Sequence, residues 1–525
     1  MQSFRLADPS DTLLDTTVAG ILASAAATTP ERVALVAGVA EPALRRRWTY
    51  ASLLASVERA AGVLAGSFEP GDRIAVFAPS LPESLMLTYA AATAGLVLVP
   101  VNPALRAAEL RHVLASSGAA GVFCVSSHRG AAVASVVEAA RADLPGVHTV
   151  VRFEDWDAWC DGPAGLLEGR APSPDDVAQI IYTSGTTGLP KGARLTHRAM
   201  TNAARGAAIR FGIRPGDVHI DTMPLSHVGG QEVAMEICQC SATAVLVAAF
   251  EPGLVLSLIE EERGTLTAGV PTMLVAMIDH PDFASRDLSS LRTLSSGGAV
   301  VPAELVRHIE AALGVEFMIV FGQTEACGFI SQTSLGDDAS DKASTLGHPL
   351  PGLDARVVDP ATSAVVDVGE VGELQVRGGT VMAGYHELPD ATAEAVTADG
   401  WLRTGDLVTM DERGYLRIAG RLKEMIVSGG LNLFPVEIEA VIQSFPGVAQ
   451  AAVVGVPDRR WGEAAVAVVR PAPGAACDPD ELEAWVRERL ASYKVPKRWV
   501  VRDELPVTPF GKVQTFVLRE ELGRI

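Results

Sequence analysis

The stretch Ile181-Tyr-Thr-Ser-Gly-Thr-Thr-Gly-Leu-Pro-Lys-Gly-Ala193 carries the strongest local signal in this chain of 525 residues. Residues 177–182 predict a strand, and a loop rich in glycine and hydroxyl side chains follows it and ends in Lys191. Glycines let backbone N–H groups turn toward a ligand, hydroxyl groups add donors, and the lysine adds a positive charge. The stretch therefore predicts an anion-binding loop that suits a polyphosphate.

This loop is not a Walker A loop, because the pattern GxxxxGK[ST] is absent and residues 192–196 predict a strand rather than a helix. Upstream, strand and helix signals alternate, which is typical of βαβ units with helices packed on parallel sheets. We expect strands at 73–78, 96–99 and 121–125, helices at 85–94 and 107–115, and a capping box at Ser80-Leu-Pro-Glu83.

The pattern changes twice toward the C-terminus. Past Pro349 the strands shorten and turn signals multiply, which predicts a smaller β-rich subdomain. After Arg421 a compact α+β pattern follows, with helices expected at 436–444 and 479–490 and strands at 451–456 and 464–469. The predicted fold class is α/β: a large N-terminal domain with two parallel-rich α/β sheet subdomains and the β-rich subdomain, followed by a small α+β C-terminal domain.

Composition excludes several functional classes. Hydrophobic residues make up 48% of the chain, so it can bury sizeable cores, and the net charge of −20 disfavours binding to nucleic acid and to anionic membranes. The six cysteines are scattered and form no disulfide framework, which favours a reducing, cytoplasmic setting. No signal peptide is expected, because Asp8, Asp11 and Asp15 precede the short apolar run Val18–Ala27. No membrane span is expected, because the longest uncharged apolar stretch, Leu85–Val101, is interrupted by Gly95 and Pro100.

The stretch 181–193 resembles the phosphate loop of the adenylate-forming superfamily, which includes acyl-CoA synthetases, peptide-synthetase adenylation domains and firefly-type luciferases. Other segments resemble the motifs of that superfamily and follow its order over nearly the whole chain. They are Trp48-Thr-Tyr50, Asp221-Thr-Met-Pro-Leu-Ser-His227, Leu294-Ser-Ser-Gly-Gly-Ala299, Phe321-Gly-Gln-Thr-Glu325, Gly400-Trp-Leu-Arg-Thr-Gly-Asp406, Gly420-Arg-Leu-Lys-Glu-Met-Ile426 and Pro509-Phe-Gly-Lys512.

The resemblance implies a site for ATP and AMP. Phe321 would stack on the adenine, and the Asp406 carboxylate would accept hydrogen bonds from the ribose diol. Arg421 would add a second ribose or phosphate contact. The expected nucleotide-binding residues are Thr183, Ser184, Gly185, Thr186, Thr187, Gly188, Lys191, Gly297, Gly298, Ala299, Phe321, Gly322, Gln323, Thr324, Asp406, Ile418, Arg421 and Lys512.

The resemblance also implies the catalytic residues, which are Thr183, His227, Glu325 and Lys512. Glu325 would hold Mg²⁺, because hard oxygen ligands suit that ion. Lys512 would bridge the substrate carboxylate and the α-phosphate, where a cation offsets the repulsion between two anions. The implied domains are residues 1–420, which bind the acid and ATP, and a mobile domain 421–525, with the hinge at Lys423 within 421–424.

The expected acyl pocket follows from the same resemblance and consists of His227, Val228, Gly229, Gly298, Gly322, Ala326 and Gly328. Residues 226–262 and 321–334 contain no lysine or arginine. A second substrate carboxylate would need a cationic partner there, so a hydrophobic monocarboxylic acid, alkyl or aryl, is expected. Glu232 and Glu236 are interpreted as helix-surface carboxylates, with a partner for a substrate amino group as the alternative.

Ser428, Gly429 and Gly430 resemble the loop that lines the pantetheine tunnel of CoA ligases. Leu431 replaces a frequent glutamate and Gln514 a frequent arginine, which leaves the acceptor open. The predicted function is an ATP-dependent acid–thiol ligase that uses ATP, Mg²⁺, CoA and a small carboxylic acid, and a homodimer is compatible with the sequence. The alternatives are transfer to a carrier-protein phosphopantetheine, luciferase-like oxidation of the adenylate, and adenylate binding without catalysis.

Overall fold

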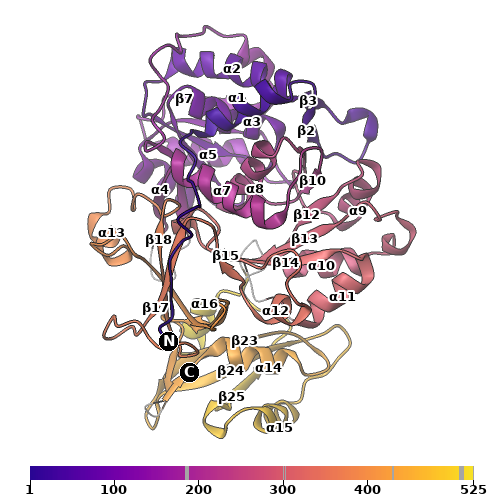
Figure 1. Ribbon diagram of the computed structural model, residues 1–525, viewed down its shortest axis with the longest axis vertical. Helices are drawn as coiled ribbons and strands as arrows, with labels where there is room; N and C mark the ends of the chain where they lie inside the picture. The colour runs from indigo at the N-terminus through magenta and orange to yellow at the C-terminus, as the bar shows by residue number, and fades with distance from the viewer. Residues whose placement is uncertain (184–188, 299–300, 302, 429–430, 508–512, 524–525) are drawn as a thin grey trace. The chain divides into compact units, whose positions relative to one another are not determined.

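The computed structural model describes residues 1–183, 189–298, 301, 303–428, 431–507 and 513–523 of the chain (Figure 1). These residues form two compact units. The larger unit comprises Leu6–Ala355 and Val376–Leu402, and the smaller unit comprises Met1–Arg5, Arg356–Gln375 and Arg403–Ile525. Among the described residues, no helix has both the length and the apolar character that a membrane span requires.

A nine-stranded sheet forms one half of the larger unit. Its interior pairings are parallel, and antiparallel pairs occur at its two edges. Parallel pairing requires crossover connections, and helices supply them here, as the alternating sequence signals predict. In spatial order the strands are β16 (His348–Pro349), β15 (Ser331–Gln332), β14 (Glu316–Phe321), β13 (Thr293–Gly297), β12 (Leu266–Ala268), β10 (Val218–Asp221), β11 (Thr243–Leu246), β2 (Val33–Ala37) and β3 (Arg47–Thr49).

A six-stranded sheet forms the other half of the larger unit. All its pairings are parallel except the last, in which β8 and β9 form an antiparallel hairpin. The strands expected at 73–78, 96–99, 121–125, 177–182 and 192–196 all belong to this sheet, within two residues at each end. In order they are β7 (Thr149–Arg152), β6 (Ala119–Cys124), β4 (Arg73–Phe77), β5 (Val97–Val101), β8 (Val177–Thr183) and β9 (Lys191–Thr196).

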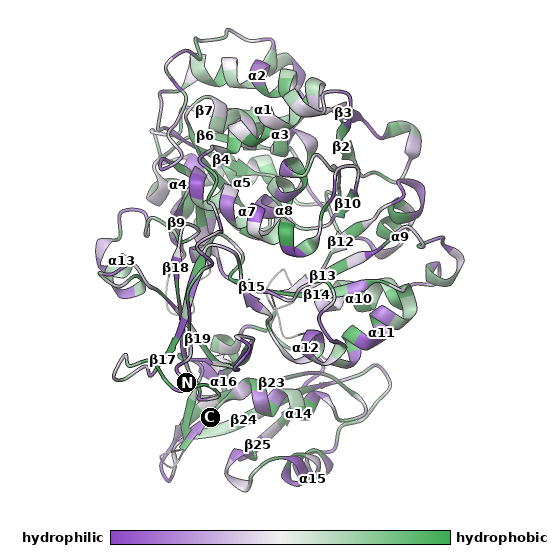
Figure 2. Cartoon of the chain, viewed as in Figure 1, coloured by the Kyte–Doolittle hydropathy of each residue, from purple (hydrophilic) through white to green (hydrophobic). Residues whose placement is uncertain are grey.

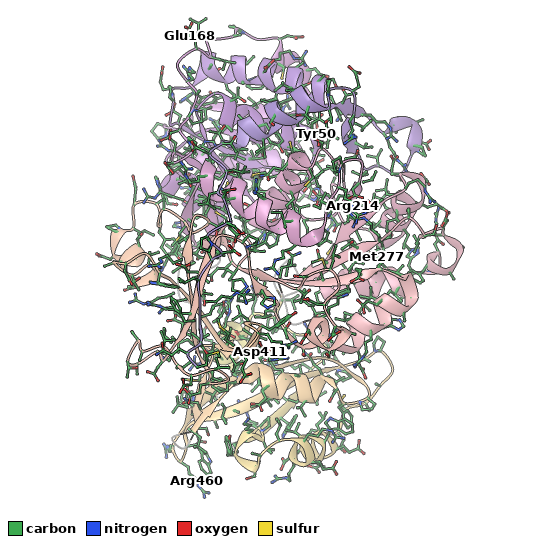
Figure 3. All side chains as sticks on the ribbon, viewed as in Figure 1. Tyr50, Glu168, Arg214, Met277, Asp411 and Arg460 are labelled. Carbon is green, nitrogen blue, oxygen red and sulfur yellow. The ribbon has the colours of Figure 1, made fainter. Side chains whose placement is uncertain are left out.

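The helices of the larger unit cover both sheets (Figure 1). They are α1 (Val18–Thr28), α2 (Tyr50–Ser67), α3 (Pro82–Thr93), α4 (Ala107–Ser117), α5 (Val133–Arg141), α6 (Trp156–Cys160), α7 (His197–Phe211), α8 (Val228–Gln239), α9 (Pro252–Glu261), α10 (Pro271–Ile278), α11 (Ala303–Leu313), α12 (Ala339–Ser344) and α13 (Pro389–Ala395). The Trp48-Thr-Tyr50 motif has a structural role: Thr49 caps α2, and the buried Tyr50 hydroxyl (Figure 3) donates to the carbonyl of Ala242 at 2.7 Å.

The capping box expected at Ser80–Glu83 is wrong. Helix α3 begins at Pro82 after Leu81, and no side chain caps it. The Ser80 hydroxyl accepts a hydrogen bond from the backbone of Leu225 at 2.9 Å, and Glu83 pairs with Arg46 at 2.6 Å. Both polar side chains are buried, so partners distant in the sequence replace the local capping bonds.

One face of the nine-stranded sheet carries a large apolar core. Because in-register residues of neighbouring strands point to the same face, Ile220, Leu294 and Phe317 lie together. They pack with apolar residues of α9, α10 and α11, including Met277 (Figure 3). Helix α11 is correspondingly amphipathic, with hydrophobic and hydrophilic residues alternating along it (Figure 2). Helices α7 and α8 lie on the opposite face.

The smaller unit contains strands of two five-stranded sheets. The first has the order β1 (Phe4–Arg5), β17 (Leu353–Val358), β18 (Gly372–Gly378), β19 (Leu402–Met410) and β20 (Leu416–Arg421). The second has the order β22 (Leu431–Leu433), β21 (Ile426–Ser428), β24 (Gly462–Pro471) and β23 (Val448–Asp458), with β25 (Arg498–Val501) beside β24. Its faces are covered by α14 (Pro435–Gln443) and α15 (Pro479–Arg489) on one side and by α16 (Thr515–Gly523) on the other.

Candidate active site

The predicted phosphate loop connects the two strands of the β8–β9 hairpin. Thr183 and Lys191 stand opposite each other where the loop leaves the sheet, and the Thr183 hydroxyl lies 3.5 Å from the Lys191 carbonyl. Ser184, Gly185, Thr186, Thr187 and Gly188 lie outside the described residues. The hairpin therefore places a hydroxyl and an ammonium group at the two ends of the loop.

Lys191, Tyr385 and Glu325 form a connected group in the larger unit. The Lys191 ammonium lies 5.1 Å from the centroid of the Tyr385 ring, and the Tyr385 hydroxyl donates to Glu325 Oε1 at 2.7 Å. Burial and, to a smaller extent, the neighbouring Glu325 carboxylate raise the pKa of Tyr385. Its hydroxyl therefore stays protonated and donates the hydrogen bond. Sequence reasoning missed Tyr385, because an aromatic residue in a turn-rich segment carries no motif of its own.

The turn after β14 brings the predicted adenine and acyl residues together. Thr324, Glu325 and Ala326 form a 3-10 turn, and Gly328 has a φ of 93°. A Cβ on Gly322 would lie 2.1 Å from the Gly328 carbonyl oxygen, so the two backbone segments touch. Residues Phe321, Gly322, Gln323, Thr324, Ala326 and Gly328 thus belong to one compact turn. 

The neighbouring strand β13 ends beside this turn. A Cβ on Gly297 would lie 2.2 Å from the carbonyl oxygen of Val320, so only glycine fits between β13 and β14 at this point. Gly298 follows with a φ of 74°, and Ala299 lies outside the described residues. Gly297 and Phe321 therefore mark the adjacent carboxyl ends of two parallel strands, where ligands of α/β sheets commonly bind.

His227 caps helix α8, whose first residues include Val228 and Gly229. Its Nδ1 accepts a hydrogen bond from the Gly229 backbone at 3.1 Å. The imidazole keeps an exposed edge, although the protein around it lowers its pKa by desolvation. His227 is therefore neutral near pH 7, and the cap fixes the orientation of its ring.

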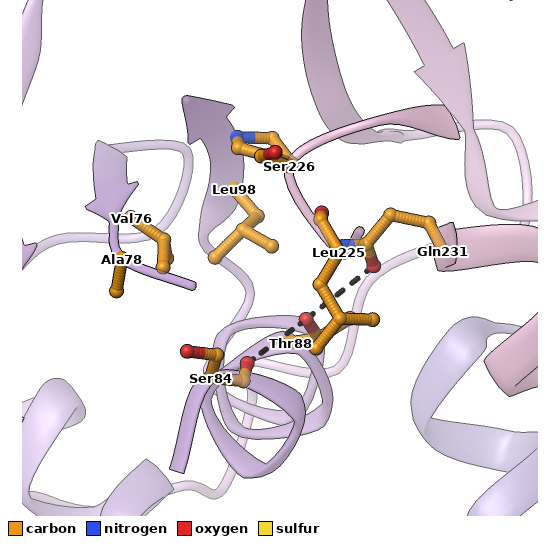
Figure 4. A pocket seen from close by; sticks show the side chains of 9 residues that line it. Val76, Ala78, Ser84, Thr88, Leu98, Leu225, Ser226 and Gln231 are labelled. Carbon is orange, nitrogen blue, oxygen red and sulfur yellow. Dashed lines mark hydrogen bonds between the residues drawn. The ribbon is translucent and has the colours of Figure 1, made fainter. Parts of the chain in front are cut away.

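The loop before His227 is held by the buried side chain of Gln231, which also accepts a hydrogen bond from the Thr88 hydroxyl at 3.4 Å (Figure 4). The Gln231 amide donates to the Leu225 carbonyl at 2.6 Å and accepts from the Gln179 amide at 3.0 Å. Gln179 belongs to β8, so these bonds tie the His227 loop to the strand that leads into the phosphate loop. A small, mainly apolar cavity beside them is lined by Val76, Ala78, Ser84, Thr88, Leu98, Pro100, Leu225, Ser226 and Gln231.

The interpretation of Glu232 and Glu236 as helix-surface carboxylates is wrong. Their exposed fractions are 0% and 4%, because every residue of α8 from Val228 to Cys238 is buried. Burial raises the pKa of each carboxyl group well above its usual range. The nearby Glu236 carboxylate raises the pKa of Glu232 further, and the nearby Asp221 carboxylate does the same for Glu236. Burial therefore favours the protonated, neutral form of both carboxyl groups.

The smaller unit carries the predicted ribose residues on two antiparallel strands. Asp406 of β19 pairs in register with Arg421 of β20, and Arg421 Nε donates to Asp406 Oδ1 at 2.9 Å. Ile418 lies on the same strand as Arg421 and pairs with Val408. Asp406 is 2% exposed and ion-paired, so its carboxylate is held in one orientation.

Lys423 lies in the turn between β20 and β21, where the backbone N–H groups of Glu424 and Met425 both donate to the Arg421 carbonyl. Ser428 ends β21 and is buried. Gly429, Gly430 and Lys512 lie outside the described residues, so their expected roles remain predictions.

Comparison with known proteins shows the family. The family model described as AMP-binding enzyme matches residues 22–386, and the one described as AMP-binding enzyme C-terminal domain matches residues 437–512. The chain belongs to the AMP-binding enzyme family.

Its relatives in this family are similar over nearly the whole chain. It is 41% identical over 478 residues to a feruloyl-CoA synthase of Amycolatopsis sp, covering 90% of this chain and 94% of the relative. It is 36% identical over 490 residues to a long-chain-fatty-acid–CoA ligase of Mycobacterium tuberculosis, covering 92% and 94%. ATP-bound MatB from Rhodopseudomonas palustris has the same fold, with a TM-score of 0.88, 30% identity, and coverage of 97% of this chain and 99% of that chain.

The family assignment confirms the predicted fold class and the predicted reaction class. This AMP-binding enzyme is an ATP-dependent acyl-CoA synthetase, which joins an acid to CoA. ATP and CoA are therefore its co-substrates.

The close approach of Gly322 to Gly328 leads to a stability prediction. Gly322→Ala should destabilise the larger unit by about 1–3 kcal/mol, because the added methyl group overlaps a backbone carbonyl and overpacks the turn. The midpoint of thermal unfolding measures the effect. Gly146→Ala is the matched control, since a Cβ at that position meets no atom within 4 Å. Equal midpoints for the two variants would contradict the close packing.

Proposed function

We propose that the substrate of this synthetase is a hydrophobic monocarboxylic acid, alkyl or aryl. The charge pattern around α8 carries this proposal: residues 226–262 and 321–334 contain no lysine or arginine, and α8 buries the carboxyl groups of Glu232 and Glu236. A second carboxylate on the substrate would lose its hydration there without gaining a cation. The feruloyl and long-chain-fatty-acid ligases among the relatives support an acid with an apolar body.

The reaction takes place in two steps. First, a substrate carboxylate oxygen attacks the α-phosphorus of ATP; the bond to the bridging oxygen of the β-phosphate breaks, and pyrophosphate leaves. Then the CoA sulfur attacks the acyl carbon of the acyl-adenylate, the thiol proton is lost to a base, and AMP leaves. The first step brings two anions together, so the main requirement is preorganised positive charge and hydrogen-bond donors.

Thr183 and Lys191 bind phosphate oxygens together with the loop that they flank. Phe321 stacks on the adenine, and Asp406, oriented by Arg421, accepts hydrogen bonds from the ribose. His227 borders the acyl pocket with Val228, Gly229, Gly298, Gly322, Ala326 and Gly328, and Ser428, Gly429 and Gly430 contact the pantetheine of CoA.

Glu325 fits a Mg²⁺ ion bound with the triphosphate. Tyr385 orients one carboxylate oxygen of Glu325 at 2.7 Å, and carboxylate oxygens are preferred ligands of this ion. The described residues contain no group of three or more His, Cys, Asp or Glu side chains that could hold a metal. This agrees with Mg²⁺ bound through one carboxylate and phosphate oxygens, as is usual for nucleotide sites. When bound, the ion would neutralise phosphate charge.

Lys512 bridges the substrate carboxylate and the α-phosphate during adenylation. It belongs to the domain of residues 421–525, which reorients against residues 1–420 between the two steps. The hinge lies at 421–424, where Lys423 stands in a turn between two strands. All six cysteines are free thiols, which supports a cytoplasmic location.

A screen of carboxylic acids tests the proposed substrate class. Alkyl and aryl monocarboxylic acids should release pyrophosphate from ATP and form acyl-CoA when CoA is present, whereas dicarboxylic acids should release none above background. Pyrophosphate release is measured with and without CoA, and acyl-CoA by mass. Turnover of dicarboxylic acids would contradict the substrate class, and pyrophosphate release without acyl-CoA would favour a carrier-protein acceptor.

Tyr385→Phe tests the role of Glu325. The variant keeps the ring beside Lys191 but removes the hydrogen bond that orients the Glu325 carboxylate. Loss of such an outer partner typically costs about 10–100-fold in metal affinity. The Mg²⁺ concentration that gives half-maximal pyrophosphate release should therefore rise about tenfold or more. Tyr385→Ala, which also removes the ring, should additionally raise the KM for ATP, and an unchanged Mg²⁺ dependence in Tyr385→Phe would argue against Glu325 as a ligand.

Lys512→Ala should impair adenylation far more than thioester formation. The bridge between carboxylate and phosphate exists only in the first step, and loss of one preorganised electrostatic group typically costs about 10²–10³-fold in rate. The two steps are measured separately, as acid-dependent pyrophosphate release and as conversion of synthetic acyl-adenylate with CoA. An equal loss in both steps would show that Lys512 has a different role.

A further inference from the structure

A second small cavity lies in the larger unit and is lined by residues of α7, α8 and the nine-stranded sheet. It is small, about 10 Å³, which leaves room for roughly one water molecule. Its lining consists of Ala207, Phe211, His219, Val233, Glu236, Ala268, Ser295, Val320, Phe329 and Gln332. The proposed reaction assigns no role to its polar residues.

The strand register explains why polar side chains reach this cavity. Ala268 pairs with Ser295, and Val320 pairs with Gln332, so these side chains point to the same face of the sheet. His219 precedes Ile220, which belongs to the apolar core, and therefore points away from that core. The face toward α8 thus carries a cluster of polar side chains, whereas the opposite face is apolar.

Four polar atoms at this cavity have no hydrogen-bond partner among the described residues. They are Glu236 Oε1, His219 Nδ1, and the amide oxygen and nitrogen of Gln332. The exposed fractions of these three residues are 4%, 2% and 0%. Buried polar groups are nearly always paired, so unpaired donors and acceptors that meet at one cavity indicate a hydrogen-bonding guest.

The charge state of the lining restricts the guest. Burial lowers the pKa of His219 to about 4, so the imidazole is neutral. Burial and, to a smaller extent, the Asp221 carboxylate raise the pKa of Glu236, which favours the neutral carboxyl, a group that can both donate and accept a hydrogen bond. The cavity therefore offers neutral donors and acceptors to the guest.

The cavity is lined by close sequence neighbours of the predicted acyl-pocket residues. Phe329 immediately follows Gly328, and Val320 stands two residues before Gly322 and pairs with Gly297, which precedes Gly298. Ser295 stands two residues before Gly297 on the same face of β13, which places it one step deeper in the sheet. The same strands and the same turn thus line both the predicted acyl pocket and the cavity.

We propose that this cavity is the far end of the acyl site and binds a hydroxyl or a similar small, neutral hydrogen-bonding group at the end of the acid remote from its carboxylate. The inference rests on the proposed function and narrows it: the substrate is an acid with an apolar body and one such terminal group, as in a phenolic acid. Phe211, Val233, Val320 and Phe329 supply apolar walls around this group.

Matched pairs of acids test the proposal on the wild-type enzyme. Cinnamate and 4-hydroxycinnamate form an aryl pair, and octanoate and 8-hydroxyoctanoate form an alkyl pair. In at least one pair, kcat/KM for acyl-CoA formation should be at least about tenfold higher for the hydroxy acid than for the unsubstituted acid. A gain of this size is expected from one buried hydrogen bond. Equal values in both pairs, or a preference for the unsubstituted acids in both, would overturn the proposal.

Substitutions then assign the preference to the cavity. The hydroxyl preference is the ratio of kcat/KM for the hydroxy acid to kcat/KM for the unsubstituted acid. Glu236→Met and Gln332→Leu should each bring this ratio close to one, while Glu236→Gln should retain most of the preference. Because the ratio is measured within one enzyme sample, a smaller folded fraction does not change it. Thr267→Val is the matched control: Thr267 is buried in the same sheet but pairs with Ile220 and Leu294 on the apolar face.

The outcomes separate this proposal from the proposed function. If no monocarboxylic acid is converted, the proposed function fails. If such acids are converted but Glu236→Met and Gln332→Leu keep the full hydroxyl preference, only the cavity assignment fails. A stronger preference for the 4-amino-methyl analogue of cinnamate than for the 4-hydroxy acid would also overturn it, because that group binds as a cation.

Discussion

The burial of helix α8 from Val228 to Cys238 is the constraint on which the rest of the larger unit depends. Residues Val228–Cys238 are all buried, so each polar side chain of the helix must find a partner inside the protein or a ligand. Gln231 at its start bonds to Gln179 of the six-stranded sheet, and Glu236 near its end faces the nine-stranded sheet. One helix therefore connects both sheets, and the loop before it carries His227.

The same burial shapes the chemistry that the proposed site can perform. A chain with a net charge of −20 must bind ATP through local donors, and the hairpin places Lys191 at one end of the phosphate loop. Around α8 there is no such positive charge, since the buried carboxyl groups of Glu232 and Glu236 occur in a stretch, residues 226–262, without lysine or arginine. The phosphate region thus favours anions, whereas the interior around α8 favours neutral groups, which suits an acid whose only charge is the reacting carboxylate.

The strands of the six-stranded sheet follow from the sequence because their apolar runs are short and bounded by turn residues. The resemblance to the family places Gly322 and Gly328 in one predicted acyl pocket, and the structure shows that their backbones touch. Local reasoning failed where a partner lies far away in the sequence. Ser80 and Glu83 match a capping box, yet they bond to Leu225 and Arg46.

By itself, the sequence determined the alternation of strands and helices, the order of the motifs and hence the family, since periodicity and turn chemistry act over a few residues. Only the tertiary structure decided which polar residues are buried and which residues they contact. The bond from Tyr385 to Glu325 joins residues 60 positions apart. Glu232 and Glu236 are buried because α1, α7 and strands of the nine-stranded sheet pack against their helix. A carboxylate on an exposed helix and one on an enclosed helix have the same local sequence pattern, and only long-range packing distinguishes them.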